Sequence, residues 1–170
     1  MKIPKILSVA FLAVLALLPS ACNKGGSGDK AKLSSDDAKN AQASYVPPGQ
    51  KDEYYLFYSG GHSGQVFVAG IPSMRHIMTI PVFSPSSGTG YGYDLATKKM
   101  MGEYTWGDVH HPGLSQTDSE YDGRWLFVND NANNRVARID LRDFKTKEIL
   151  GPIPNSMGNH GSSFVTENTE

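Results

Sequence analysis

The sequence predicts an all-β fold, and two observations carry that prediction. Short runs of apolar and aromatic residues, such as residues 54–58 and 65–69, alternate with turns rich in glycine, proline and asparagine. No stretch shows the long apolar period of 3.6 residues that marks an amphipathic helix. Between residues 121 and 150 three strand-like segments follow one another, which resembles most of one blade of a β-propeller.

An internal repeat supports the prediction of propeller blades. Residues 93–99 resemble residues 139–141 and 145–147, and the aspartates Asp94 and Asp140 lie roughly 46 residues apart. Periods of this length suit four-stranded blades around an axis, where equivalent positions of successive blades face one central channel. About 120 residues make only two or three such blades, whereas closed rings need at least four. Either several chains share one ring, or the chain is a fragment; we expect the first blades of a larger propeller.

The first 22 residues are predicted to be an export signal. Lys2 and Lys5 precede an apolar run over residues 6–18, which is too short to span a membrane comfortably. The run ends at Cys22 in a pattern similar to a lipoprotein cleavage site, so we expect a lipid-modified cysteine and attachment to a membrane. Ordinary cleavage near Ala21 stays open. Cys22 is the only cysteine, so we expect neither a disulfide nor a thiolate metal ligand.

Residues 23–50 are polar and nearly free of large apolar side chains, which predicts a flexible tether. The remaining residues, 51–170, are expected to form the folded body. The formal net charge is −1 and no basic cluster stands out, so nucleic acid is not an expected partner.

Three of the five histidines fall in two places, His110-His111 and His160, and they raise the question of a metal site. In a regular strand, adjacent side chains point to opposite faces and could not reach one ion. Gly107 and Pro112 predict irregular backbone that would let both imidazoles converge, and Pro112 favours an extended His111. The alternative is a pair of surface-loop histidines without a function.

Longer motifs resemble the nitrous-oxide reductase family. They are residues 60–64, 70–75 and 80–83, then Asp108-Val109-His110-His111-Pro112, and finally residues 117–118, 121–123, 129–130, 132–133, 135–139 and 160–161. The resemblance covers about residues 54–170. It implies the N-terminal blades of a seven-bladed propeller in a periplasmic enzyme that reduces nitrous oxide to dinitrogen and water in denitrification.

The resemblance also implies cofactors and partners. His110, His111 and His160 match the first three ligands of a tetranuclear copper–sulfide centre, and Asp108 matches an acid beside it that could orient a ligand or exchange protons. A dinuclear copper centre and any calcium ligands would lie beyond this chain. The electron donor would be a cytochrome c or a small copper protein, and the full-length enzyme would be a homodimer. We expect the 170-residue chain alone to be inactive.

Two features differ from better-known members of this family: Val109 before the histidine pair, and the lack of an arginine pair near Met1. The export signal resembles that of the Sec-exported branch of the family. His62 and His76 match no ligand position and are expected to be structural or exposed. Trp106 and Trp125 are expected to pack within blades, and Asp118 and Asp122 to form turns. Two other functions stay open: a lipid-anchored propeller that only binds a partner, and a mononuclear zinc site.

Overall fold

The computed structural model describes residues 34–161 and 166–169, so the predicted export signal and Cys22 lie outside the described residues. The elements are α1 (Ser35–Ala43), β1 (Tyr54–Ser59), β2 (Gln65–Ile71), β3 (His76–Pro81), α2 (Leu95–Met101), β4 (Val109–Thr117), β5 (Glu120–Asp130), β6 (Arg135–Asp140) and β7 (Lys145–Leu150). Strands dominate, which confirms the all-β prediction. Within the described ranges, no helix has the length and apolar content needed to cross a bilayer.

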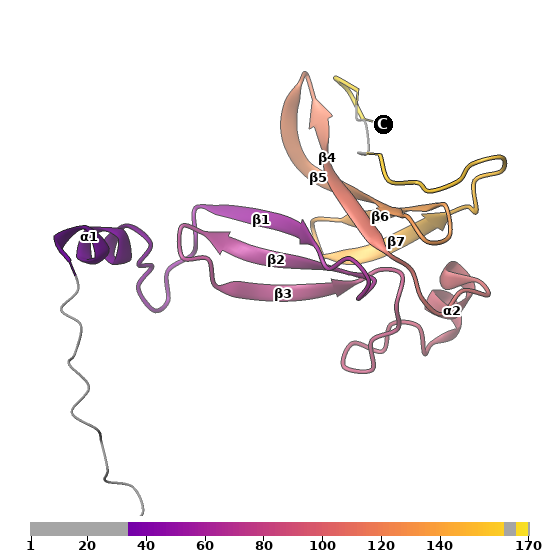
Figure 1. Cartoon of the computed structure of the whole chain (residues 1–170), viewed down its shortest axis with the longest axis horizontal. Coiled ribbons are helices and arrows are strands. Elements are labelled where there is room, and N and C mark those ends of the chain that lie inside the picture. The colour runs from indigo at the N-terminus through magenta and orange to yellow at the C-terminus, as the bar shows by residue number, and fades with distance from the viewer. Residues whose placement is uncertain (1–33, 162–165, 170) are drawn as a thin grey trace, which may run out of the picture. The chain divides into compact units, whose positions relative to one another are not determined.

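The strands form two antiparallel sheets in which neighbours in sequence are neighbours in space (Figure 1). The first sheet has the order β1-β2-β3 and the second the order β4-β5-β6-β7. The predicted run of three strands between residues 121 and 150 is confirmed as β5, β6 and β7. Two such meanders are compatible with propeller blades.

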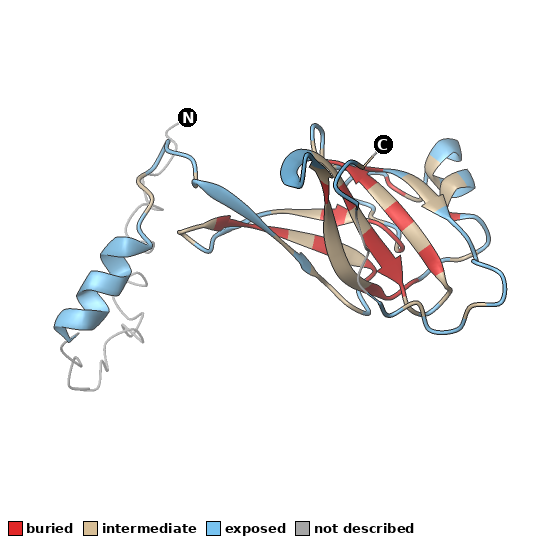
Figure 2. Ribbon diagram, turned by 90° about the horizontal axis from the view of Figure 1, so that it is seen from above, coloured by how far each residue is buried: buried red, intermediate tan, exposed pale blue. Residues whose placement is uncertain are grey.

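A single apolar core joins the two sheets. Alternate positions of β2 contribute Val66 and Val68, and alternate positions of β6 contribute Ala137 and Ile139, because side chains along a strand point to opposite faces in turn. Val109, at the start of β4, belongs to the same cluster and is fully buried. Figure 2 shows the buried residues concentrated in these strands. The residues just before the paired histidines are therefore anchored in the core.

The helix α1 lies in the segment that was predicted to be a tether. Ser34 and Asp37 explain where it starts: the Asp37 amide donates to Ser34 Oγ, and the Ser34 amide donates to Asp37 Oδ2. None of its residues is buried (Figure 2). Judged by the contacts within each part, the chain divides into two units, Met1–Ala38 and Lys39–Glu170. Both sheets belong to the second unit. The role of the segment as a tether stays a prediction.

The two copies of the predicted repeat have different structures. Asp94 caps the N-terminus of α2 by accepting a hydrogen bond from the Thr97 amide, whereas Asp140 is the last residue of β6 and pairs with Arg124 and Arg142. The short match reflects the use of aspartate to accept nearby N–H groups in both settings. The repeat therefore does not explain why the histidines meet.

One predicted turn is misplaced. Asp122 and Gly123 lie inside β5, while the reversal between β4 and β5 is made by Asp118 and Ser119, whose φ angles are 51° and 66°. Asp122 accepts hydrogen bonds from the hydroxyls of Ser115 and Thr117, near an irregularity in the β4–β5 register. Asp118 is thus confirmed as a turn residue, and the assignment of Asp122 to a turn was wrong.

Candidate metal site

The paired histidines sit at an irregularity of β4. His110 lies opposite Asn129 of β5, the next regular pair is Gly113 with Phe127, and the register shifts between the two. At the shift His111 has a φ of 44°, in the left-handed region, so the expected extended conformation of His111 was wrong. The expected irregular backbone is confirmed. A bulge of this kind re-aims a side chain, and here the two imidazole centroids are 5.6 Å apart.

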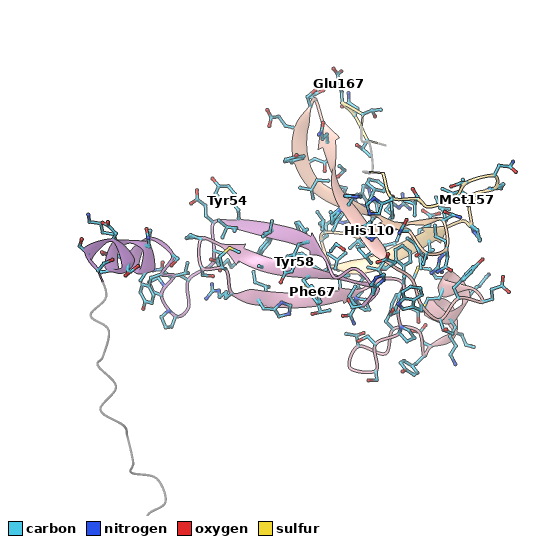
Figure 3. The ribbon with its side chains drawn as sticks, viewed as in Figure 1. Tyr54, Tyr58, Phe67, His110, Met157 and Glu167 are labelled. Atoms are coloured by element: carbon cyan, nitrogen blue, oxygen red, sulfur yellow. The ribbon has the colours of Figure 1, made fainter. Side chains whose placement is uncertain are left out.

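His160 joins this pair from the loop that follows β7. Its ring centroid lies 4.3 Å from that of His110 and 4.7 Å from that of His111. One nitrogen from each of the three rings can be chosen so that all lie within 4.8 Å of one another. Figure 3 labels His110 on β4. The structure therefore brings together all three histidines that the sequence selected.

Asp108 is 3% exposed and lies beside this cluster. Its Oδ2 is 3.0 Å from His110 Nε2, and Asn131 Nδ2 donates to the same oxygen at 3.4 Å. When His110 Nε2 carries the proton and donates to Asp108, the Nδ1 lone pair of His110 is left for a metal. A carboxylate in this position fixes both the tautomer and the orientation of a metal-binding imidazole.

Asp108 also faces a histidine that the sequence analysis set aside. Its Oδ1 has no hydrogen-bond partner among the described residues, and His62 Nδ1 lies 3.4 Å from it. The His62 side chain is 83% exposed, as expected, and its ring stacks on Trp106 at 5.9 Å between centroids. Trp106 Nε1 donates to the His62 carbonyl at 2.6 Å. Trp106 is thus half-exposed beside the site instead of packing inside a blade.

The other aromatic and histidine predictions have mixed outcomes. Trp125 is half-buried on β5 and lies under the guanidinium groups of Arg124 and Arg138, at 4.0 and 4.4 Å from its ring centroid. His76 is exposed, as expected, and its Nε2 is 3.2 Å from Thr79 Oγ1. His62 was missed as a neighbour of Asp108, because the isolated pairing of Gly61 with Val109 that brings its loop there has no local signal in the sequence.

The donor set suits copper. Three imidazoles from two distant segments meet, and the three-member group contains no carboxylate; Asp108 lies beside it through its contact with His110. Imidazole is a common ligand of copper. Among the described residues, this is the only place where three side chains that can bind a metal lie close enough together to share one ion. The residues present therefore fit copper held by imidazole nitrogen.

Comparison with known proteins agrees with this chemistry. No protein-family profile matches the sequence. The nitrous-oxide reductase of Pseudomonas fluorescens is 51% identical over 128 residues, which is 73% of this chain and 20% of that protein. The Stutzerimonas stutzeri enzyme is 47% identical over 126 residues, which is 72% of this chain and 20% of the relative. Over this stretch the chain belongs to the nitrous-oxide reductase family.

A longer match covers more of this chain. The nitrous-oxide reductase of Cupriavidus necator is 39% identical over 171 aligned positions, which cover 92% of this chain and 26% of the relative. The chain thus spans about a fifth to a quarter of the length of the nitrous-oxide reductases that it matches. The resemblance carried by the histidine motifs is confirmed, while the activity of the whole enzyme concerns much more protein than this chain contains.

Proposed function

We propose that His110, His111 and His160 hold copper as part of a tetranuclear copper–sulfide centre, and that this chain forms the N-terminal part of a nitrous-oxide reductase. The reaction takes up two electrons and two protons and converts nitrous oxide to dinitrogen and water. The observation that carries the proposal is the meeting of three imidazoles within 4.8 Å, in a chain related to enzymes of that name.

Copper held by these histidines would pass electrons from a donor to nitrous oxide. The residues of this chain have separate tasks around it. The three histidines offer neutral nitrogen donors, and Asp108 holds His110 in one orientation through the contact of 3.0 Å. Because Asp108 is buried, its carboxylate is kept close to the ligand ring instead of turning out into solvent. Asp108 is thus a positioning residue, with no catalytic residue separate from the copper ligands.

The same proposal extends to the fold. β1 carries Tyr54, Leu56 and Tyr58 at alternate positions, so they share one face, and these residues are 62%, 40% and 40% exposed. Figure 3 labels Tyr54 and Tyr58 on this strand. Such an apolar face is what a further blade would cover. A seven-bladed propeller whose first blades are the two observed sheets accounts for it. The remaining copper ligands, the dinuclear copper centre and any calcium site would then belong to the rest of the enzyme.

Cellular placement and partners follow from the resemblance and from residues 1–22. We propose export by the Sec route to the periplasm, attachment to a membrane through a lipid on Cys22, and electron delivery by a cytochrome c or a small copper protein. The complete enzyme would be a homodimer. Labelling of the chain with a radioactive or clickable fatty acid in its host, with Cys22→Ala as control, tests the lipid directly.

Copper titration of the whole chain tests the site. Wild type should bind copper through histidine nitrogens, and His110→Ala, His111→Ala and His160→Ala should each weaken that binding by about 10-fold or more. His76→Ala is the matched control, because His76 is exposed and its hydrogen bond in the described structure goes to Thr79. Equal binding by all five proteins would overturn the proposal. Folded protein that takes up no copper would favour the alternative of a propeller that only binds a partner.

A further inference from the structure

The β5–β6 turn, defined as residues 129–135 so that it includes the strand ends on both sides, has contacts with both histidine-bearing segments. β5 ends at Asp130 and β6 begins at Arg135, and these two residues form the last pair of the β5–β6 ladder. The turn is rich in asparagine and aspartate, whose short side chains reach nearby backbone groups. Its side chains bond to the segment before His110 and to the segment around His160.

The first set of contacts fixes residues 106–108. Asp130 Oδ1 accepts a hydrogen bond from the Asp108 amide at 2.9 Å, and Asn133 Nδ2 donates to the Trp106 carbonyl at 2.8 Å. Asp130 is itself paired with Arg135 at 2.7 Å, and both side chains are at most 1% exposed. A Cβ on Gly107 would lie 2.6 Å from Asp130 Oδ2, so only glycine allows the backbone this close.

The second set fixes the residues on both sides of His160. Asn134 Nδ2 donates to the Ser156 carbonyl at 2.9 Å, and the Asn159 amide donates to Asn134 Oδ1 at 3.2 Å. Asn159 Nδ2 donates to the Arg135 carbonyl at 3.2 Å. Asn129 Nδ2 also donates to the carbonyl of Gly161. The residues that directly precede and follow His160 are thus both tied to the turn.

We propose that the β5–β6 turn positions His160 against the His110-His111 pair, with Asn134 and Asn159 as positioning residues. A buried ion pair contributes little net stability, so the Asp130–Arg135 pair is better explained as a means of fixing geometry. His160 is exposed and lies in a loop, outside the described strands, and a side chain in such a loop needs an outside contact to hold its place. The claim that the positioned His160 binds copper rests on the proposed function. The claim that the turn holds His160 in place does not.

The test uses two side-chain deletions and one matched control in the whole chain. Asn134→Gly suits the φ of 52° at that position and removes both contacts to the loop, and Asn159→Ala removes the contact to Arg135. Asn155→Gly is the control. It replaces an asparagine by glycine at a similar φ of 57°, but in the loop that carries His160, and no hydrogen bond links the Asn155 side chain to the turn in the described structure.

Two readouts separate positioning from metal binding. In metal-free protein, nuclear Overhauser contacts between the His160 ring and the His110 ring report their 4.3 Å approach. We expect these contacts in wild type and Asn155→Gly and their loss in Asn134→Gly and Asn159→Ala. With Cu²⁺ added, pulsed electron paramagnetic resonance should count one coordinated histidine fewer in the two variants, as in His160→Ala, with affinity lower by about 10- to 100-fold.

Ring contacts that survive unchanged in both Asn134→Gly and Asn159→Ala would overturn the inference. Loss of the contacts in the two variants, with retention in the control, supports it whatever the copper result. If that pattern appears while wild type fails to bind Cu²⁺ through histidine, the proposed function fails and the positioning role stands. Circular dichroism of each variant verifies that the strands remain formed.

Discussion

Replacement of Asp130 by asparagine should be far more destabilising than replacement of its partner Arg135 by methionine. Asp130 accepts from Arg135 Nε and from four further donors: the amides of Asp108, Ala132 and Asn133, and the Asn133 side chain. An asparagine has the same shape, but in either orientation its NH₂ group faces donors. Arg135, which is 1% exposed, would then have no counter-charge from residue 130.

The expected magnitudes follow from this asymmetry. Removing one partner of a buried pair typically costs about 3–5 kcal/mol, so Asp130→Asn should approach that range. Arg135→Met leaves Asp130 with its four other donors and should cost about 1–3 kcal/mol, mainly through the lost bonds to the Met101 and Trp106 carbonyls. The double variant should be no less stable than Asp130→Asn alone, because the uncompensated cation is gone.

Urea unfolding followed by circular dichroism and tryptophan fluorescence measures these differences. A loss of about 4 kcal/mol moves the urea midpoint by about 2 M in a domain of this size. Asp140→Asn, at the far end of β6, serves as a comparison for the loss of a carboxylate that pairs with two more exposed arginines. Equal costs for Asp130→Asn and Arg135→Met, or a double variant whose cost equals their sum, would refute the reasoning.

Two further predictions concern acid stability and the glycine before Asp108. The pKa of Asp140 lies well below its ordinary value, chiefly because the Arg142 side chain donates to the carboxylate, with Arg124 adding to the effect. A lowered folded-state pKa gives stability that is present above the unfolded value of about 4 and is lost as the pH falls below it. Wild type should therefore lose stability more steeply than Asp140→Asn between about pH 4 and pH 2 in thermal melts, and parallel curves would contradict this. Gly107→Ala places a Cβ 2.5 Å from Phe83 Cβ and should cost about 1–3 kcal/mol in urea unfolding, whereas Gly88→Ala, with nothing within 4 Å, should be neutral.

The local patterns of the sequence were sufficient for β1, β2, β5, β6 and β7 and for raising the question of a metal at the histidines, but they did not place β3 or β4. A run of apolar residues that favour strands placed β2, and partial alternation placed β6, because burial of one face of a strand imposes a period of two on the sequence. Gly107 and Pro112 indicated irregular backbone at His110-His111, and the register shift in β4 confirms it. The family motifs then distinguished His160 from the exposed His76.

Other features depended on contacts between distant residues. The same Asp-Leu pair begins a helix at Asp94 and ends a strand at Asp140, because the groups that the carboxylate meets differ: the Thr97 amide in one case, two arginines in the other. The left-handed φ of His111 arises from the bulge against β5, which outweighs the local preference for extended backbone before proline.

The sequence by itself determined which side chains could bind a metal, since imidazole chemistry and motif order are properties of the chain. Only the tertiary structure decided that they meet. His160 reaches His110 because Asn129 and Asn134 of one turn bond to its loop, and Asp108 is held beside His110 through Asp130. These hydrogen bonds join segments more than 20 residues apart, and no local pattern of residues encodes a partner at that distance.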